Sequence, residues 1–410
     1  MAALRPKGPP AADFAHVVWV HSAVPLGDCA AGQPCGVLVT WEVRAPYPAL
    51  QPVVRLTHPQ TGEWARVHPF HYPTGEWTVG EVVLDQHVLV PPPGAPPVDG
   101  YEIAVGFFHP DTLDILPRVG PDEGFAGLEV MFPLGGLEPA TAAGSTPPLP
   151  ASCRPALADA RMDGVRLLGW SPVPAALRPG ERLALTLCWQ ALTAPLSDQT
   201  VRLWLEGPIP VSLYEDAPVY GRLPFSAWSA GMRVEDRLTV RLPRDVPPGE
   251  YRVYLAVGPG DPVHLGTLTV SSLKRTFAVP ALPHPLEADF GEAIRLLGYE
   301  VGEARRGEPL SLVLYWQAQR EMEEDYTVFV HLMDPQSGAL LAQVDEMPQH
   351  GAYPTSLWVR GEVVRDEHTL VVPALPAGSY ALRVGLYLKE TGRRLPVGEE
   401  HFVRLPLEIR

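Results

Sequence analysis

The middle of the chain alternates apolar and polar residues in a way that is typical of a β-strand with one buried face. From Arg233 to Leu242 the inward residues are Val234, Asp236, Leu238, Val240 and Leu242, and the outward ones are Arg233, Glu235, Arg237, Thr239 and Arg241. Similar short runs, separated by proline and glycine turns, recur along the chain, as at 182–189 and 251–257. The pattern predicts an all-β protein, with at most a helical turn in each of 158–169 and 287–298.

One phrase of the sequence is written twice and survives a third time in altered form. YPTGEWTVGEVVLDQHVLVPP at 72–92 matches YPTSLWVRGEVVRDEHTLVVP at 353–373 at 13 positions, and PFSAWSAGMRVEDRLTVRLP at 224–243 keeps the same frame. That frame is P-x3-W-x2-G-x4-D-x6-P. A strand pattern ending in tryptophan precedes each copy, and another strand pattern follows it. Internal repetition at this spacing indicates tandem domains.

We therefore expect three tandem antiparallel β-sandwich domains, immunoglobulin-like or jelly-roll-like. Composition places their boundaries, because tracts rich in proline and alanine hold too little apolar surface to fold. The predicted sandwiches span 13–135, 161–275 and 291–410, with the middle one divergent. The tract at 136–160 is the expected flexible linker, and 276–290 is a shorter, stiffer one.

The register of the middle copy turns the repeated aspartate inward in all three copies, at Asp85, Asp236 and Asp366. A buried carboxylate without partners costs several kcal/mol, so each must accept hydrogen bonds from turn backbone N–H groups or from an indole. His87 and His368 share the inward face, but the middle copy has Leu238 at that position. We therefore expect the aspartate to be structural and an acid–base role for the Asp-x-His pair to be absent.

Two tryptophan positions recur in each copy. One ends the preceding strand, where alternation with valine and leucine places it in the core, at Trp41, Trp189 and Trp316. The other precedes the turn glycine by three residues, at Trp77, Trp228 and Trp358. It either closes the edge of a sandwich or lies exposed, where an indole can stack on a sugar or anchor a partner protein. Its presence in every copy favours the buried role.

The exposed alternative defines a candidate ligand site for a glycan or a surface protein. Its stacking residues are Trp77 and Trp358, and its polar groups are Glu81 and Glu362. No signature of a serine hydrolase, a zinc protease, a phosphate-binding loop or a dinucleotide fold occurs, and Ser271–Lys274 (SSLK) lacks the companion motifs of a Ser-x-x-Lys enzyme. We therefore expect no enzyme activity and no cofactor.

Charge and cysteine usage narrow the partners and the compartment. A formal charge of −15 argues against nucleic acid or an anionic membrane as the main partner. No apolar run is long enough to span a bilayer, and an export signal, if there is one, lies outside this sequence. Cys29 and Cys35 flank a turn and could close a disulfide, which would place the chain outside the reducing cytosol. Buried free thiols are the alternative for all four cysteines.

Neither the cysteines nor the histidines show the spacing of a metal site. His58, His68 and His71 lie around one predicted hairpin and could be imagined with Asp85 as ligands. The third copy does not repeat this set, so chance clustering is the better interpretation. We expect no metal.

The third copy carries P-T-x-x-W-x-x-G-E-x-x-x-D, then P-A-G-x-Y, V-G-L-Y and R-L-P. This pattern resembles the soluble β-sandwich modules that follow the membrane helices of some bacterial glycosyltransferases of the dolichyl-phosphate-mannose type, and that occur in tandem in related surface proteins. The resemblance covers 291–400 well, 35–120 fairly and the middle copy poorly. It implies accessory modules and transfers no catalytic residue.

Together these observations predict a non-catalytic, extracytoplasmic protein that serves as a binding, adhesion or spacer element at a bacterial cell surface. The alternative is a carbohydrate-binding accessory protein of a glycan-processing or glycosyltransferase system.

Overall fold

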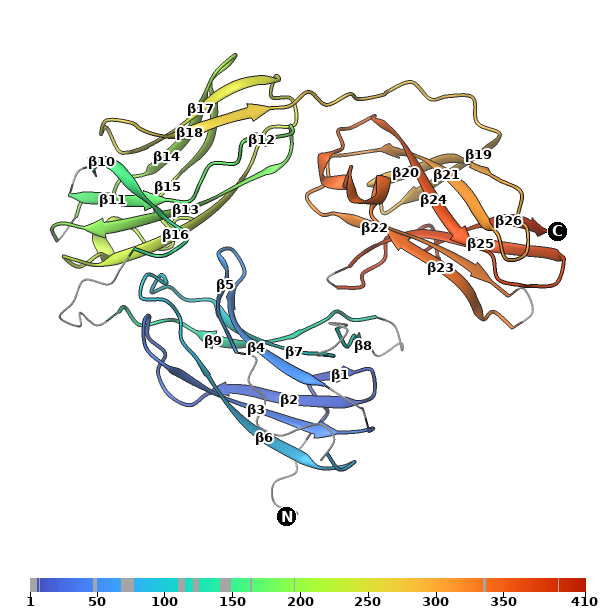
Figure 1. Cartoon of the computed structure of the whole chain (residues 1–410), viewed down its shortest axis with the longest axis horizontal. Coiled ribbons are helices and arrows are strands. Elements are labelled where there is room, and N and C mark those ends of the chain that lie inside the picture. Colours follow the sequence, from blue (N-terminus) through green and yellow to red (C-terminus); the bar gives the residue numbers. More distant parts are fainter. Residues whose placement is uncertain are drawn as a thin grey trace. The chain divides into compact units, whose positions relative to one another are not determined.

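The computed structural model describes residues 6, 8–46, 50–67, 77–109, 115–120, 125–140, 149–162, 164–194, 196–334, 337–389 and 391–410. These residues form six β-sheets, which confirms the all-β prediction (Figure 1). The chain divides into two compact units. Unit 1 comprises Met1–Leu177, Arg182–Leu242 and Val246–Ser271, and unit 2 comprises Arg178–Glu181, Pro243–Asp245 and Ser272–Arg410.

Unit 1 contains four of the sheets, two from each half of its sequence. The sheets of the first half are β6 (Val82–Leu89), β3 (Cys35–Val43), β2 (Val18–Pro25), β1 (Ala12–Phe14) and β8 (Arg118–Val119), and β5 (Gly62–Val67), β4 (Gln51–His58), β7 (Tyr101–Phe108) and β9 (Val130–Gly135). Those of the second half are β10 (Arg154–Met162), β11 (Val165–Trp170), β13 (Arg182–Ala191) and β16 (Arg233–Arg241), and β12 (Ala176–Leu177), β18 (Val263–Val270), β17 (Gly249–Val257), β14 (Val201–Glu206) and β15 (Val211–Asp216).

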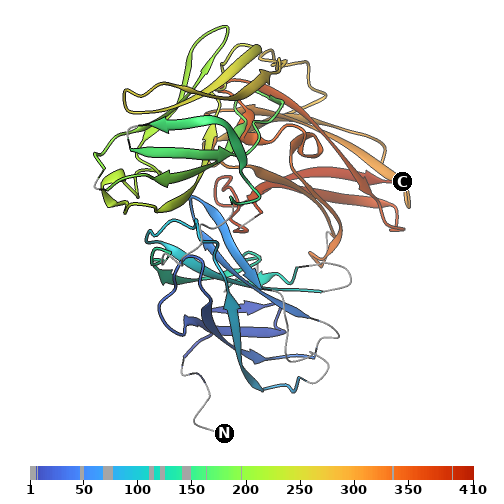
Figure 2. The ribbon, with the colours of Figure 1, turned by 60° about the vertical axis from the view of Figure 1, so that its left-hand side comes forward.

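Unit 2 contains the last two sheets, which lie against each other over one apolar core (Figures 1 and 2). One is β19 (His284–Phe290), β20 (Ile294–Val301), β21 (Pro309–Ala318) and β24 (Val363–Val371), and the other is β23 (Leu340–Glu346), β22 (Tyr326–Met333), β25 (Gly378–Leu388) and β26 (Val403–Ile409). Short 3-10 turns, η3 (Phe225–Ala227), η4 (Pro348–Gly351) and η5 (Thr355–Leu357), precede β16 and β24.

The expected helical turns at 158–169 and 287–298 are wrong, because both segments form antiparallel hairpins, β10–β11 and β19–β20. Their apolar residues alternate, as a strand requires, with Val165 and Leu167 buried in the first hairpin. Strands β10 and β19 also begin inside the two tracts expected to be linkers. Proline and alanine lower the apparent strand tendency of these tracts, but backbone pairing to the next strand decides their structure.

The predicted inward face of β16 is buried throughout, and the outward face contains one exception, Glu235. This side chain is 3% exposed, and its backbone N–H donates to the Gly94 carbonyl at 2.8 Å within unit 1. Burial raises the pKa of Glu235, which Arg237 opposes. Alternation alone could not indicate this burial, because the covering segment belongs to another part of unit 1.

The repeated tryptophan and aspartate occupy the same register in three strand pairs, β3–β6, β13–β16 and β21–β24. The aspartate faces Val39, Leu187 and Leu314 of the neighbouring strand, and the tryptophan two residues further along that strand faces Val83, Val234 and Val364. The indoles are fully buried at Trp41, Trp189 and Trp316, and the carboxyl groups are buried at Asp85, Asp236 and Asp366. The repeat therefore builds one interior arrangement three times.

The buried aspartate holds a turn in an uncommon backbone conformation. Asp236 accepts a hydrogen bond from the Val219 N–H at 3.1 Å, and Asp366 accepts one from the Gln349 N–H at 2.7 Å. Each of these amides begins a run of three residues with positive φ: Val219, Tyr220 and Gly221, with φ of 57°, 53° and 79°, and Gln349, His350 and Gly351, with φ of 52°, 55° and 82°. Non-glycine residues adopt this region at an energetic cost. The carboxyl group helps to offset that cost.

The remaining oxygen of the aspartate is treated differently in the two described turns. Asp366 Oδ2 lies 2.7 Å from His368 Nε2 and accepts from Trp316 Nε1 at 3.2 Å. Asp236 Oδ2 has no hydrogen-bond partner among the described residues, and Leu238 occupies the histidine position. Burial accordingly raises the pKa of Asp236 to about 7, with the Val219 N–H opposing the shift. The middle copy keeps the carboxyl group by favouring its neutral form.

Both pairs of cysteines are disulfides, Cys29–Cys35, which was one of the two alternatives for that pair, and Cys153–Cys188 in addition, so the free-thiol alternative is wrong. The second bridge joins the start of β10 to the central strand β13 over a sequence separation of 35, against 6 for the first.

The two disulfides should contribute unequally to stability. Loop-closure entropy predicts a loss of about 4 kcal/mol for C153S/C188S and about 2 kcal/mol for C29S/C35S. Urea unfolding of the oxidised protein and both double variants, followed by tryptophan fluorescence, checks the ranking. Equal losses would contradict the entropic account.

The raised pKa of Asp236 should make unit 1 less stable as the pH rises. Between about pH 4 and 7 the folded state retains a proton that the unfolded state has lost, so the free energy of unfolding falls by up to about 4 kcal/mol and then levels off. We expect D236N to remove most of this decline and to exceed the wild type in stability at pH 8. Urea titrations at pH 5, 6, 7 and 8 measure both curves.

The matched control is D366N, which should lower stability at every pH. An amide there would place its own N–H groups against the donors that Asp366 now satisfies. A stabilising effect of D366N would show that the two aspartates are equivalent.

Candidate functional site

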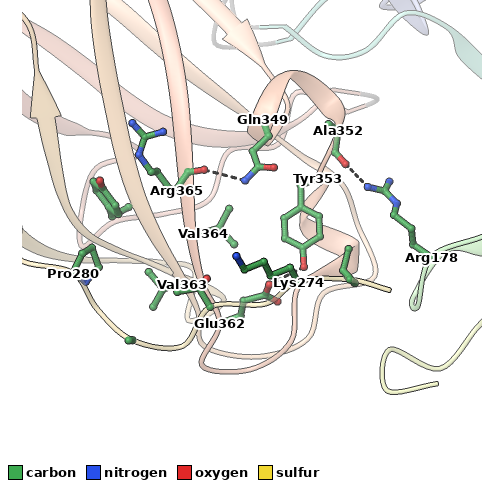
Figure 3. Close-up of a pocket in the computed structure, with 14 residues that line it drawn as sticks. Arg178, Lys274, Pro280, Gln349, Ala352, Tyr353, Glu362, Val363, Val364 and Arg365 are labelled. Atoms are coloured by element: carbon green, nitrogen blue, oxygen red, sulfur yellow. Dashed lines mark hydrogen bonds between the residues drawn. The ribbon is translucent and has the colours of Figure 1, made fainter. Parts of the chain in front are cut away.

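A pocket of about 540 Å³ opens in unit 2 where the segment 273–280 passes the start of β24 (Figure 3). Its polar wall is formed by Arg178, Lys274, Gln349, Tyr353, Glu362 and Arg365. Apolar side chains of the segment and of β24, among them Leu273, Pro280, Val363 and Val364, complete the lining. A hollow of this size with convergent polar groups is a typical small-molecule site.

One wall of the pocket depends on the aspartate-held turn. The Asp366 carboxyl group fixes the Gln349 backbone, and the Gln349 side chain donates from Nε2 to the Arg365 carbonyl at 3.0 Å. The chain then continues to Ala352, whose carbonyl accepts from Arg178 at 2.5 Å, and to Tyr353 (Figure 3). The turn that Asp366 holds and the pocket wall are therefore parts of the same continuous segment.

The other wall is anchored by Arg275. Its guanidinium donates to Glu362 Oε2 at 2.6 Å, to the Tyr353 hydroxyl at 2.9 Å and to the Leu357 carbonyl at 2.9 Å. Beside it the Val363 N–H donates to the Thr276 carbonyl at 2.7 Å, so the segment adds a backbone contact to the edge of β24. These bonds hold the position from which Lys274 extends.

Glu362, a predicted ligand residue, lines the pocket, but its carboxylate is occupied by the protein. It accepts from Arg275, from the Tyr353 hydroxyl at 2.7 Å and from the Val359 N–H at 3.1 Å, and the residue is 1% exposed. Burial and the adjacent carboxylate raise the pKa of Tyr353, which keeps the phenol protonated as a donor. The first copy repeats the turn contact, since Glu81 accepts from the Thr78 N–H at 3.1 Å. The shared glutamate thus closes the W-x-x-G-E turn.

Trp358 is 0% exposed and offers no face on which a sugar could stack, so the stacking alternative fails at this residue. Its indole donates to the Tyr353 carbonyl at 3.1 Å, and Trp228 makes the same bond to Leu223 at 3.1 Å. Each indole thus donates a hydrogen bond to the backbone carbonyl five residues earlier. Trp77 is half-buried, with its ring 6.2 Å from that of Trp41, and a ligand role for Trp77 and Glu81 stays a prediction.

The three copies differ at the positions that face the pocket. Tyr315 of β21 and Arg365 of β24 are register partners on the outer face of their sheet. The corresponding pair is Thr40 and Leu84 in the first copy, and Cys188 and Glu235 in the second. The pocket chemistry of unit 2 is therefore specific to the third copy, whereas the buried strand-end tryptophan and aspartate are common to all.

Other candidates from the sequence do not assemble into a site. His58 is buried and bonded to backbone groups, and His68 and His71 lie outside the described residues, as does Tyr72–Glu76 of the first repeat. Within the described ranges no three His, Cys, Asp or Glu side chains are grouped as metal ligands would be. His368 and Asp366 are enclosed in the core of unit 2.

None of the helices described is suited in length and hydropathy to crossing a membrane.

The sequence did not indicate Lys274, Gln349, Tyr315 or Arg365 as pocket residues. Lys274 belongs to the SSLK stretch, which lacks the companion motifs of a Ser-x-x-Lys enzyme. The signal that could have found Tyr315 and Arg365 is the outward face of the repeated strand, where the copies diverge in charge and size.

No family model and no curated protein sequence matches the chain. Solved structures give remote similarities. Dimeric latent PorU from Porphyromonas gingivalis is 12% identical with a TM-score of 0.21, over 98% of this chain and 34% of that one. The chain thus spans about a third of the length of PorU.

Two further structures are similarly remote. The Bacteroides ovatus protein SGBP-B of a mixed-linkage glucan utilization locus, in complex with a mixed-linkage heptasaccharide, is 11% identical with a TM-score of 0.16, over 95% of this chain and 66% of that one. Three N-terminal domains of the bacteriophage RB49 outer capsid protein Hoc are 10% identical with a TM-score of 0.20, over 97% and 99%. At these scores none of the likenesses identifies a function for this chain.

Removing the charge of Glu362 should destabilise unit 2. E362Q leaves Arg275 without its carboxylate, and we expect the free energy of unfolding to fall by about 1–3 kcal/mol. Urea unfolding measures the change, with E399Q at an exposed position as the control. A loss no larger than that of the control would contradict the structural role.

Proposed function

We propose that this chain is a non-catalytic, extracytoplasmic protein of three tandem immunoglobulin-like β-sandwiches that binds a glycan at a bacterial cell surface. The three successive pairs of sheets and the register shared by β3–β6, β13–β16 and β21–β24 support the tandem arrangement. The pocket beside β24 is the proposed binding site. The resemblance of the third copy to modules appended to bacterial membrane glycosyltransferases agrees with a role in glycan biology.

The extracytoplasmic location is supported by the two disulfides. Disulfides persist in oxidising compartments and are rare in cytosolic proteins of mesophiles. The pairing of Cys153 with Cys188, far apart in sequence, closes a long loop at the start of β10. Such a bond is most useful to a protein that works where chaperones and reductants are scarce.

The observation that carries the binding function is that some repeat positions build the interior in every copy, whereas others differ between the copies and line the pocket. The strand-end tryptophan and the inward aspartate common to the copies are buried, and the pair that differs, Tyr315 and Arg365 in the third copy, lies at the pocket. A spacer would need the first set alone. A concave surface with phenol, amide, ammonium and guanidinium groups suits a polyhydroxylated ligand, which uses many hydrogen bonds and apolar ring faces.

A glycan array probed with the full-length protein tests this function. We expect one group of related glycans to bind, and A278W, which places an indole in the pocket, to abolish binding. A281W, three residues further along the chain and outside the pocket lining, is the matched control. Binding that survives A278W would place the site elsewhere, and an array without any bound glycan would reject the glycan-binding proposal.

A further inference from the structure

We propose that the ligand of the β24 pocket is an acidic glycan, and that Lys274 binds its anionic substituent, a carboxylate, sulfate or phosphate ester. This inference rests on the proposed function and narrows it from glycans in general to those that carry negative charge. It is derived from the charge balance of the pocket and from the state of each cation in it.

The pocket is cationic in a strongly acidic chain. The protein has a formal charge of −15, yet the lining contains Arg178, Lys274 and Arg365 against the single carboxylate of Glu362. That carboxylate is already matched by Arg275 at 2.6 Å. Arg178 and Arg365 have carboxylate partners outside the lining, Glu181 and Glu367, so the uncompensated positive charge at the pocket is that of Lys274, to which an anionic ligand would be attracted.

The three cations differ in their availability. Arg178 is engaged by Glu181 at 2.7 Å and by the Ala352 carbonyl, and Arg365 is paired with Glu367. Lys274 is exposed and makes no hydrogen bond or ion pair with any residue in the described part of the chain. Its ammonium group has three donors on a flexible stem and acts as a point charge, which suits a carboxylate, sulfate or phosphate in several orientations.

The groups around Lys274 suit the sugar that would carry the charge. In Figure 3 the Lys274 amino group extends toward Val364, and Gln349 lies across the hollow with its amide nitrogen bonded to the Arg365 carbonyl. The Gln349 amide oxygen is then left to accept from a ligand hydroxyl. Leu273, Ala278 and Pro280, which are not buried, provide the apolar surface against which a ring face packs.

The test compares acidic sugars with their neutral counterparts, and a variant of the pocket lysine with a variant of a lysine outside the pocket. Isothermal titration calorimetry would compare the full-length protein with glucuronic acid oligosaccharides, their carboxyl-reduced glucose counterparts, 6-sulfated and 6-phosphorylated glucose oligosaccharides, and inorganic sulfate and phosphate. The variant is K274M, which keeps the length and apolar stem of the side chain. The control is K389M, because Lys389 is also exposed in unit 2 but does not line the pocket.

We expect at least one acidic series to bind about tenfold or more tightly than its neutral counterpart, and K274M to lose that preference while K389M keeps it. Raising the salt concentration should weaken the acidic ligand and leave the neutral one unchanged. The acidic series that binds best identifies whether the substituent is carboxylate, sulfate or phosphate.

Equal affinity for acidic and neutral partners, or an unchanged preference in K274M, would overturn the assignment of Lys274 while leaving glycan binding intact. Binding of inorganic sulfate or phosphate as tight as that of the sugars would overturn the acidic-glycan assignment, because the sugar would then contribute nothing. Absence of binding to every saccharide, acidic or neutral, would overturn this inference together with the proposed function.

Discussion

The buried aspartate of the repeat is the constraint on which the rest of unit 2 depends. Asp366 is enclosed in the core, and a carboxyl group in that position must be satisfied by donors from the protein. It obtains one of them from the Gln349 amide, at the start of three residues with positive φ. The interior of the sheet thereby dictates the path of a surface turn, and that turn provides Gln349, Ala352 and Tyr353 to the pocket.

Strand alternation separates what the repeat must keep from what it can change. Inward residues of β24 and its counterparts meet the opposite sheet, where a different volume or charge would disturb close packing. Outward residues meet solvent or a passing segment, so Leu84, Glu235 and Arg365 can occupy one repeat position without altering the register. A scaffold of this kind allows three copies with one interior to present three different outer surfaces.

The sequence was sufficient for the parts of the structure that depend on local pattern. Alternation placed Asp85, Asp236 and Asp366 inward, and spacing indicated the Cys29–Cys35 bridge as one of two alternatives. It could not identify the bonds of Glu362, because its main partner, Arg275, is 87 residues earlier in the chain. The hairpins β10–β11 and β19–β20 were missed for a related reason, since their proline- and alanine-rich strands are recognisable only by the strands they pair with.

The middle copy shows how the aspartate can be retained after its partners are lost. In the third copy an indole and an imidazole supply donors to Asp366 Oδ2, whereas Leu238 replaces the imidazole in the second and leaves Asp236 Oδ2 without a bond from the described residues. Replacing the acid by a side chain without an oxygen acceptor would release the Val219 amide and with it the left-handed turn. Proton uptake removes the buried charge while keeping that acceptor, since a neutral carboxyl group still accepts from an amide. The aspartate is therefore retained because its oxygen accepts from the amide of the turn, and its negative charge is not what the position requires.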